Sequence, residues 1–331
     1  MKAIVCHRYG APEALRPEDV DKPTPGDGQV LIQIRAASLN AMDWHFMKGR
    51  PPIARLFLGL RRPKLNRPGV DLAGRVEAVG AGVTQFKPGD DVFGLGRGSL
   101  AEYVCTTESR LATKPASVSF EEAAAIPVAG LTALQGVRDH GRIQPGQRVL
   151  VNGAAGGVGT FAVQVAKSFG ADVTGVCSAR NVELVRAIGA DRVVDYNLAD
   201  FTRSGERYDL IFDLVANHSF SACRRVLTPR GTMVVAGGGG SDGHAFGRRL
   251  VRMLTGALIS RFTGQRMAFF VARPTQADLV TLGGLLESRK VTSVIDSRHR
   301  LSETSEAFRR LAGGHARGKI VVAAGQSGRS D

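Results

Sequence analysis

The first third of the chain consists of short apolar runs separated by turn residues. Runs of this kind, rich in β-branched residues and bounded by glycine and proline, are typical of β-strands. The predicted strands are Lys2–His7, Gln29–Ala37, Gly74–Gly80 and Ala101–Thr106. The N-terminal part is therefore predicted to be rich in β-structure.

From about Glu121 the pattern changes, and apolar strands alternate with segments of helical period. The predicted series is Arg148–Asn152, Gly157–Phe169, Asp172–Cys177, Asn181–Ile188, Arg192–Asp195, Asp209–Leu214, Cys223–Leu227 and Thr232–Ala236. Such alternation implies right-handed βαβ crossovers and a parallel sheet buried on both faces. We therefore expect an α/β fold with a doubly wound parallel sheet.

The last segment of the chain alternates helices and strands again. The predicted elements are a helix at Gln276–Ser288, a strand at Ser293–Asp296, a helix at Glu303–Leu311 and a strand at Lys319–Ala323. The total length of 331 residues corresponds to about two domains.

Composition excludes several classes of protein. Hydrophobic residues make up 43% and charged residues 22% of the chain, which excludes wholesale disorder. The four cysteines lie far apart without a CxxC spacing, which argues against a disulfide framework and a thiolate zinc site. No signal peptide and no apolar run long enough to span a membrane is apparent, so we expect a cytoplasmic protein.

The net charge is +14, from 44 Lys and Arg against 30 Asp and Glu. One basic stretch runs from Arg50 to Arg67, and a second from Arg248 to Arg266. A positive field of this kind favours phosphorylated or polyanionic ligands. A solvated basic surface without a partner explains the same residues.

The sharpest motif is a glycine-rich turn between an apolar strand and an amphipathic helix. The strand Arg148–Asn152 leads into Gly153, and the turn and helix start are Ala154, Ala155, Gly156, Gly157, Val158 and Gly159. Residues without bulky side chains let backbone N–H groups approach a pyrophosphate, and the start of a helix adds partial positive charge. Strand, turn, helix and second strand arrive in the order of a dinucleotide-binding unit, so these six residues are predicted to bind a dinucleotide cofactor.

The end of the second strand of this unit discriminates between cofactors. An NAD site places a carboxylate there to hold the ribose hydroxyls. This chain has Ser178 and Arg180 instead, a hydroxyl and a planar cation suited to a 2′-phosphate. Glu183 is near, but we expect it to face solvent from the following helix. The predicted cofactor is NADP(H).

Five motifs in order along the chain resemble the medium-chain dehydrogenase/reductase superfamily. They are Pro68–Gly74, Phe86–Val92, Gly98–Val104, Gly130–Ala133 and Ala154–Gly159. The resemblance implies a GroES-like catalytic domain of residues 1–125 with 273–331, and a Rossmann NADP-binding domain of residues 126–272. It also suggests a homodimer joined through edge strands of the nucleotide domain.

The absence of zinc-ligand residues indicates which branch of the superfamily the chain resembles. Zinc-dependent members have ligands at the positions of Asn40, Val70 and Ala129, and none of these three side chains suits Zn²⁺. The chain resembles the zinc-independent quinone oxidoreductase branch, which reduces quinones and α,β-unsaturated carbonyls with NADPH. No metal site is expected. Asp43 and Asp71 are interpreted as hydrogen-bonded structural acids rather than catalysts.

The resemblance points to further site residues, each with a plainer alternative. Asn40 is predicted to hydrogen-bond a substrate or nicotinamide-ribose oxygen, with a helix cap as the alternative. Thr132 is predicted to reach the nicotinamide ribose or phosphate. Tyr196 resembles the family tyrosine beside the adenosine phosphate, unless it is a half-buried strand aromatic. Lys319 is predicted to contact the cofactor, unless it is a solvated strand lysine.

Several alternatives remain open at this stage. A non-catalytic, nucleotide-dependent RNA-binding protein would use the basic surface, but basic motifs interleaved with aromatic residues are lacking, so nucleic acid is not an expected partner. A zinc-type alcohol dehydrogenase would need ligands from unexpected positions. The apolar segment Met253–Phe262 forms a peripheral membrane contact, an active-site wall or a dimer contact. Cys177 is either an oxidisable thiol or, as we prefer, a buried inert one.

Overall fold

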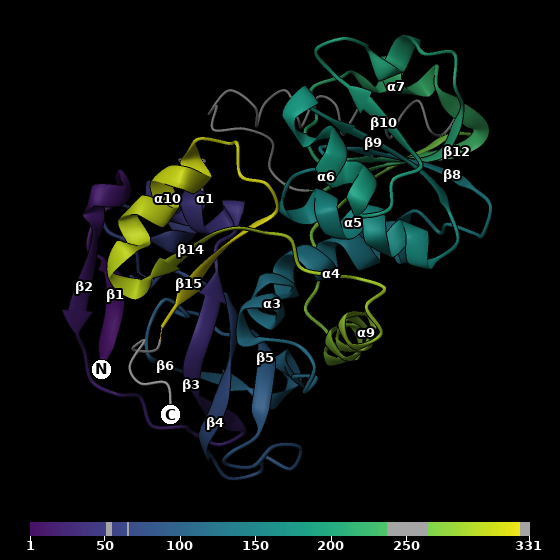
Figure 1. Cartoon of the computed structure of the whole chain (residues 1–331). Coiled ribbons are helices and arrows are strands. Elements are labelled where there is room, and N and C mark those ends of the chain that lie inside the picture. Colours follow the sequence, from purple (N-terminus) through teal and green to yellow (C-terminus); the bar gives the residue numbers. More distant parts are fainter. Residues whose placement is uncertain (51–54, 65, 237–263, 325–331) are drawn as a thin grey trace. The chain divides into compact units, whose positions relative to one another are not determined.

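The computed structural model describes residues 1–50, 55–64, 66–236 and 264–324. The chain forms two compact units, which are described separately (Figure 1). Unit 1 comprises Met1–Val128, Pro274–Arg289 and Ser293–Asp331. Unit 2 comprises Ala129–Arg273 and Lys290–Thr292.

Unit 1 is built on a sheet with the strand order β14-β15-β3-β4-β5-β7, with β6 paired to β3. All neighbours in this sheet are antiparallel except β14 and β15, which are parallel. The strands are β3 (Gln29–Ser38), β4 (Asp71–Val79), β5 (Asp91–Leu95), β6 (Tyr103–Thr107), β7 (Leu111–Thr113), β14 (Ile295–Arg300) and β15 (Lys319–Ala323). A separate antiparallel pair is formed by β1 (Lys2–Cys6) and β2 (Leu15–Asp19).

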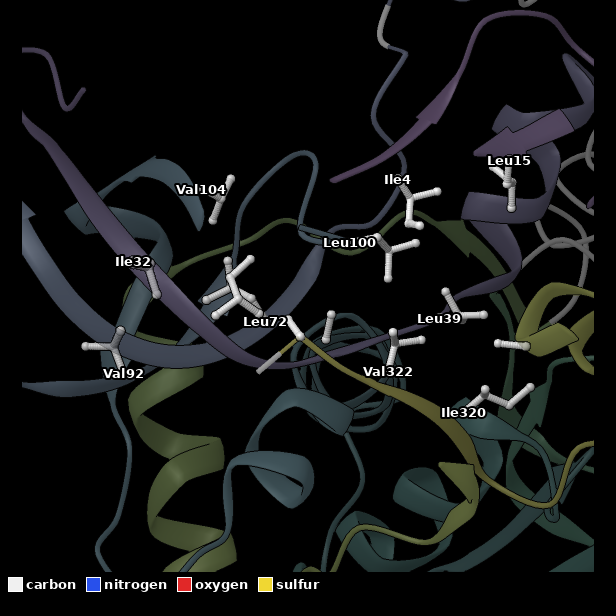
Figure 2. Packing of buried hydrophobic residues seen from close by; sticks show 14 of the residues in the cluster. Ile4, Leu15, Ile32, Leu39, Leu72, Val92, Leu100, Val104, Ile320 and Val322 are labelled. Carbon is white, nitrogen blue, oxygen red and sulfur yellow. The ribbon is translucent and has the colours of Figure 1, made fainter. Parts of the chain in front are cut away.

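The helices of unit 1 are α1 (Ala41–Lys48), α2 (Arg55–Leu58), α3 (Phe120–Ala125), α9 (Gln276–Glu287) and α10 (Thr304–Ala312). Short 3₁₀ turns lie at Pro12–Ala14, Glu108–Arg110 and Leu301–Glu303. Figure 2 shows part of the core, in which Ile4, Ile32, Leu72 and Ile320 belong to one buried cluster. Segments more than 300 residues apart in the sequence therefore share one hydrophobic core.

Unit 2 is built on a six-stranded, entirely parallel sheet in the order β10-β9-β8-β11-β12-β13. The strands are β8 (Arg148–Asn152), β9 (Asp172–Cys177), β10 (Arg192–Asp195), β11 (Tyr208–Asp213), β12 (Leu227–Ala236) and β13 (Arg266–Phe270). The chain runs outward from β8 in one direction and from β11 in the other, so the order reverses between these two strands. Ligands of doubly wound sheets bind outside the carboxyl ends of the strands at such a reversal.

The helices of unit 2 are α5 (Gly157–Ser168), α6 (Val182–Ala187) and α7 (Phe220–Arg224). Helix α4 (Pro127–Gln135) continues into a π-helical turn at Gly136–His140, and 3₁₀ turns lie at Ala179–Asn181 and Phe201–Arg203. Helices α5 and α6 cover one face of the sheet (Figure 1). The predicted α/β class, with a parallel sheet and a β-rich second part, is confirmed.

Some predicted limits are wrong. The predicted element Cys223–Leu227 spans the end of α7 and the start of β12, because Ser219 begins a helix earlier by accepting a hydrogen bond from the Ala222 N–H at 3.1 Å. Strand β4 begins at Asp71 rather than at the predicted Gly74, because residues 71–73 pair with β3 on one side and with β5 on the other. Strands β2, β5, β7 and β13 lie outside the predicted elements, because runs this short give little periodic signal.

Candidate functional site

The glycine-rich turn lies at the carboxyl end of β8, as predicted. Gly153 has a φ of +91°, which favours glycine, and Gly156 immediately precedes α5. A Cβ atom at Gly159 would lie 2.0 Å from the carbonyl oxygen of Gly153, so only glycine fits there. The first N–H groups of a helix have no partner within the helix, and their partial positive charge suits a phosphate. The turn therefore fits the pyrophosphate of a dinucleotide.

The other predicted residues of this turn have different environments. Ala154 and Ala155 are buried, and the Ala154 N–H donates to the Val176 carbonyl of β9 at 3.0 Å. Val158 is half-buried. The turn is thus held against β9, which brings it to the strand whose end carries Ser178 and Arg180.

Ser178 and Arg180 lie just beyond β9, in and before the 3₁₀ turn Ala179–Asn181. Ser178 is half-buried and its Oγ accepts from Asn181 Nδ2 at 3.2 Å, while Arg180 is exposed. The side chain of Glu183 is 86% exposed and pairs with Arg186 at 2.9 Å. The expectation that Glu183 faces solvent is confirmed, and the Glu183 carboxylate forms an ion pair with Arg186.

One carboxylate at this edge was missed by the sequence interpretation. Asp195 ends β10, and the parallel register places it beside Cys177 at the end of β9. Its Oδ1 accepts from the N–H and the amide of Asn197 at 3.0 and 2.9 Å. Burial, and secondarily the charge of Asp195, raise the pKa of Cys177 to about 11. The buried Cys177 thiol is therefore protonated at neutral pH, in agreement with its interpretation as inert.

Tyr196 and Thr132 occupy very different surroundings. Tyr196 follows β10 and is 58% exposed, so its interpretation as a half-buried strand aromatic is wrong. Its backbone N–H donates to the Cys177 carbonyl at 3.1 Å, which holds it beside the end of β9. Thr132 is buried on α4. The roles predicted for both residues toward a cofactor stay predictions.

A polar cluster that the sequence interpretation missed marks the reversal of strand order. Asn152 ends β8 and Asp213 ends β11, the two strands that flank the reversal. Asn152 Nδ2 donates to Asp213 Oδ1 at 2.8 Å and to Asn217 Oδ1 at 2.9 Å. The same Asp213 oxygen accepts from the N–H groups of Val215 and Ala216. These hydrogen bonds connect the end of β8 to the turn after β11. The cluster cannot be recognised from the sequence, because its members come together only when β8 and β11 are neighbours in the sheet.

Unit 1 contains a buried network centred on Asn40. Asn40 precedes α1, and its N–H donates to the Asp43 carboxylate at 2.8 Å. Its side-chain Nδ2 donates to Asp71 Oδ2 at 2.8 Å, and the Lys319 ammonium donates to its Oδ1 at 2.6 Å. Lys319 also donates to Asp71 at 3.2 Å, and Ser38 donates to the same carboxylate at 2.9 Å. The ends of β3, α1, β4 and β15 thus meet in one hydrogen-bonded cluster.

Burial sets the electrostatics of this network. Lys319 is only 3% exposed, so its interpretation as a solvated lysine is wrong, and its direct contact with a cofactor stays a prediction. Asp71 and Asp43 are buried and hydrogen-bonded, in agreement with their interpretation as structural acids. Burial raises the pKa of Asp43 to about 7, although the Asn40 N–H partly offsets this. Asp71 instead forms an ion pair with Lys319.

The residues at the zinc-ligand positions of the superfamily do not suit a zinc ion. The Asn40 oxygen already accepts from an ammonium, and Val70 and Ala129 have no donor atoms. A second cation next to the Lys319 ammonium would be repelled. Among the described residues, no group of three or more His, Cys, Asp or Glu side chains could hold a metal.

Two features of the sequence fall partly or wholly beyond the described residues. The apolar segment Met253–Phe262 and most of the second basic stretch lie outside them, as do parts of the first. Within the described part of the chain, no helix is both long and apolar enough to cross a membrane.

Comparisons with known proteins extend over nearly the whole chain. Residues 26–116 match the alcohol dehydrogenase GroES-like domain family, and residues 188–322 match the zinc-binding dehydrogenase family. The chloroplast envelope quinone oxidoreductase homolog of Arabidopsis thaliana is 35% identical, over 97% of this chain and 98% of that protein. The 2-methylene-furan-3-one reductase of Solanum lycopersicum is also 35% identical, over 97% of this chain and 79% of that protein.

Solved structures agree with these matches. A mycobacterial protein solved in complex with NADPH superimposes with a TM-score of 0.81 at 27% identity, over 98% of this chain and 100% of that chain. The fold, the ordered motifs and the relatives above 30% identity lead to one conclusion. The chain belongs to the medium-chain dehydrogenase/reductase superfamily, in its quinone oxidoreductase-like branch.

Proposed function

We propose that the chain is an NADPH-dependent, zinc-independent oxidoreductase that transfers hydride to quinones or α,β-unsaturated carbonyls. Membership of the superfamily makes it an NAD(P)H-dependent oxidoreductase; the choice of NADPH, of these acceptors and of a metal-free mechanism is the proposal. The observation that carries the dependence on a dinucleotide is the glycine turn, in which Gly159 lies too close to Gly153 for any side chain.

The choice of NADPH is supported at the end of β9. Ser178 and the exposed Arg180 stand where an NAD site has a carboxylate, and Glu183 is engaged by Arg186. An arginine offers a fork of donors that matches a phosphate. The related mycobacterial protein was solved with NADPH. The exposed ring of Tyr196 is proposed to lie beside the adenosine phosphate, and Thr132 to reach the nicotinamide ribose or phosphate.

The class of acceptor is supported by the donor set in unit 1. Reduction of an ordinary carbonyl is harder without a Lewis acid to polarise it, and Asn40, Val70 and Ala129 do not suit a metal ion. Quinones and enones are already electrophilic at a conjugated carbon. When bound, the reduced nicotinamide supplies hydride to that carbon. The chain itself then has to bind and orient the acceptor and exclude water. It also has to donate a hydrogen bond to an oxygen of the acceptor, and Asn40 is the residue proposed for this. The two relatives are named for a quinone and for a conjugated ketone.

A panel of acceptors tests this function. Purified protein is mixed with NADPH or NADH and with quinones, enals, enones or ethanol, and loss of the reduced cofactor is followed by its absorbance. We expect turnover with NADPH and conjugated acceptors, none with ethanol, and no change after treatment with a metal chelator. Loss of activity on chelation, restored by zinc, would contradict the metal-free mechanism.

We further propose a homodimer joined through an edge of the parallel sheet of unit 2. In the described part of that sheet, β10 and β13 are the two edge strands. Light scattering coupled to size-exclusion chromatography measures the mass, and a 35.1 kDa particle would contradict the proposal.

A further inference from the structure

The side-chain amide of Asn40 is held in a single orientation by two opposite charges. Its Nδ2 donates to Asp71 at 2.8 Å, and its Oδ1 accepts from Lys319 at 2.6 Å. A carboxylate only accepts hydrogen bonds and an ammonium only donates them. A flipped amide would set oxygen against the carboxylate and NH₂ against the ammonium. The ion pair therefore determines where the amide hydrogens of Asn40 point.

The positive charge of Lys319 strengthens the Asn40 amide as a hydrogen-bond donor. The Lys319 ammonium on the oxygen draws electron density away from Nδ2, which makes both of its N–H groups stronger donors, while the Asp71 carboxylate fixes the direction of the first N–H. The Nδ2 atom carries two hydrogens, and among the described residues only Asp71 accepts one of them. The second N–H is thus a polarised donor. Asn40 is 8% exposed, whereas Asp71 and Lys319 are more deeply buried, so Asn40 is the most exposed residue of the network.

We propose that Asp71 and Lys319 are positioning residues, which hold Asn40 so that its second N–H donates to the acceptor's oxygen as that oxygen becomes an anion. This inference rests on the function proposed above. Hydride from the reduced nicotinamide forms a C–H bond at the conjugated carbon, the displaced π-electron pair moves to the carbonyl oxygen, and water then supplies a proton. A donor fixed beforehand for that oxygen stabilises charge that develops in the transition state.

The proposal predicts a dependence on the acceptor that a purely structural role does not. The enolate formed from a simple enone is more basic than the anion formed from a quinone, so it gains more from a hydrogen-bond donor. Lys319→Met is therefore expected to lower kcat with an enone about 10- to 100-fold, and with a quinone at most about threefold. The KM for NADPH should not change; a raised KM with unchanged kcat would support the direct cofactor contact of Lys319 instead and overturn the positioning role.

A double-mutant cycle tests whether Lys319 acts through Asn40. In the Asn40→Ala background, Lys319→Met should cause no further loss of kcat with the enone. Because Lys319→Met leaves the buried Asp71 charge unpaired, the pair D71N/K319M is measured alongside it, and folding is checked by circular dichroism. Lys114→Met is the matched control, since Lys114 is another buried lysine whose ammonium donates to the carbonyls of Pro115 and Val118. It should leave the ratio of enone to quinone rates unchanged.

A second readout does not depend on activity. In a ¹⁵N–¹H spectrum, the side-chain amide pair of Asn40 is assigned by its loss in Asn40→Ala. Lys319→Met and D71N/K319M should shift this pair, and Lys114→Met should not. If the wild-type protein reduces no acceptor, the proposed function fails, and the spectrum still tests the orientation of the amide. If the wild-type protein turns over, any one of three results overturns the inference. The losses of kcat caused by Asn40→Ala and Lys319→Met are additive, Lys319→Met lowers the enone and quinone rates equally, or the Asn40 amide signals do not shift.

Discussion

Replacing Gly159 with alanine tests the packing of the cofactor turn directly. A Cβ atom at this position would lie 2.0 Å from the Gly153 oxygen, 2.8 Å from the Gly153 carbonyl carbon and 2.9 Å from the Ala154 carbonyl carbon. These contacts are with backbone atoms, so the new methyl group can only be accommodated if the turn or the start of α5 moves. Overpacking of this kind costs about 1–3 kcal/mol. In the proposed complex this movement also displaces the turn from the phosphate, and each 1.4 kcal/mol of lost binding free energy raises the Kd for NADPH about tenfold.

The neighbouring Gly156→Ala variant is the matched control. Its Cβ atom would lie 3.4 Å from the same Gly153 oxygen, an ordinary contact, and the φ of Gly156 is −81°. Its unfolding free energy should therefore stay within about 0.5–1 kcal/mol of wild type. Denaturant unfolding and fluorescence titration with NADPH measure stability and affinity. If Gly159→Ala is as stable as Gly156→Ala and binds NADPH with wild-type affinity, the turn does not hold the cofactor in the way proposed.

Three further predictions follow from individual side chains. Arg180→Glu should raise the KM for NADPH about 10- to 100-fold with little effect on NADH, because a charge-assisted hydrogen bond is worth about 1.5–3 kcal/mol. Arg203→Glu, at an exposed arginine in the turn Phe201–Arg203, is the control, and equal effects of Arg180→Glu on both cofactors would remove the assigned role. The folded-state pKa of Asp43, about 7, is above its unfolded value of 3.8, so the free energy of unfolding should fall as the pH rises from about 4 to 7. Denaturant unfolding at several pH values measures this dependence, and Asp43→Asn should lack it. Cys177, with a pKa of about 11 and a buried thiol, should be alkylated by iodoacetamide near neutral pH only after unfolding, and mass spectrometry showing rapid labelling of the folded protein would contradict this.

The first elements of unit 2 could be predicted from sequence because their signals are local. The strand Arg148–Asn152 has the predicted limits, and helix α5 ends one residue earlier than predicted. The apolar residues Phe161 and Val165 occupy the buried face that their spacing indicates. In such segments the hydrophobic periodicity and the glycine turn both lie within one short stretch of consecutive residues, so no knowledge of the tertiary fold is needed to predict them.

The Asn40 network could not be predicted, because its members meet only through the tertiary fold. Lys319 and Asn40 are 279 positions apart, and nothing in the Lys319 segment distinguishes a buried lysine from a solvated one. Asp195 reaches the end of β9 only through the register of two parallel strands. Sequence suggests which residues are chemically suitable, but pairing between distant strands decides which of them share a site.

The last strand of the chain has a consequence for synthesis on the ribosome. Strand β15 pairs with β3 and with β14, and it brings the Lys319 ammonium to the buried Asp71 carboxylate. The first 128 residues therefore emerge long before the strand and the counter-charge that complete their sheet, whereas Ala129–Arg273 emerges as one continuous stretch. Domains usually fold in the order in which they are made. Here the N-terminal part of unit 1 cannot complete its sheet until β15 has been made, so we expect the continuous stretch of unit 2 to fold first.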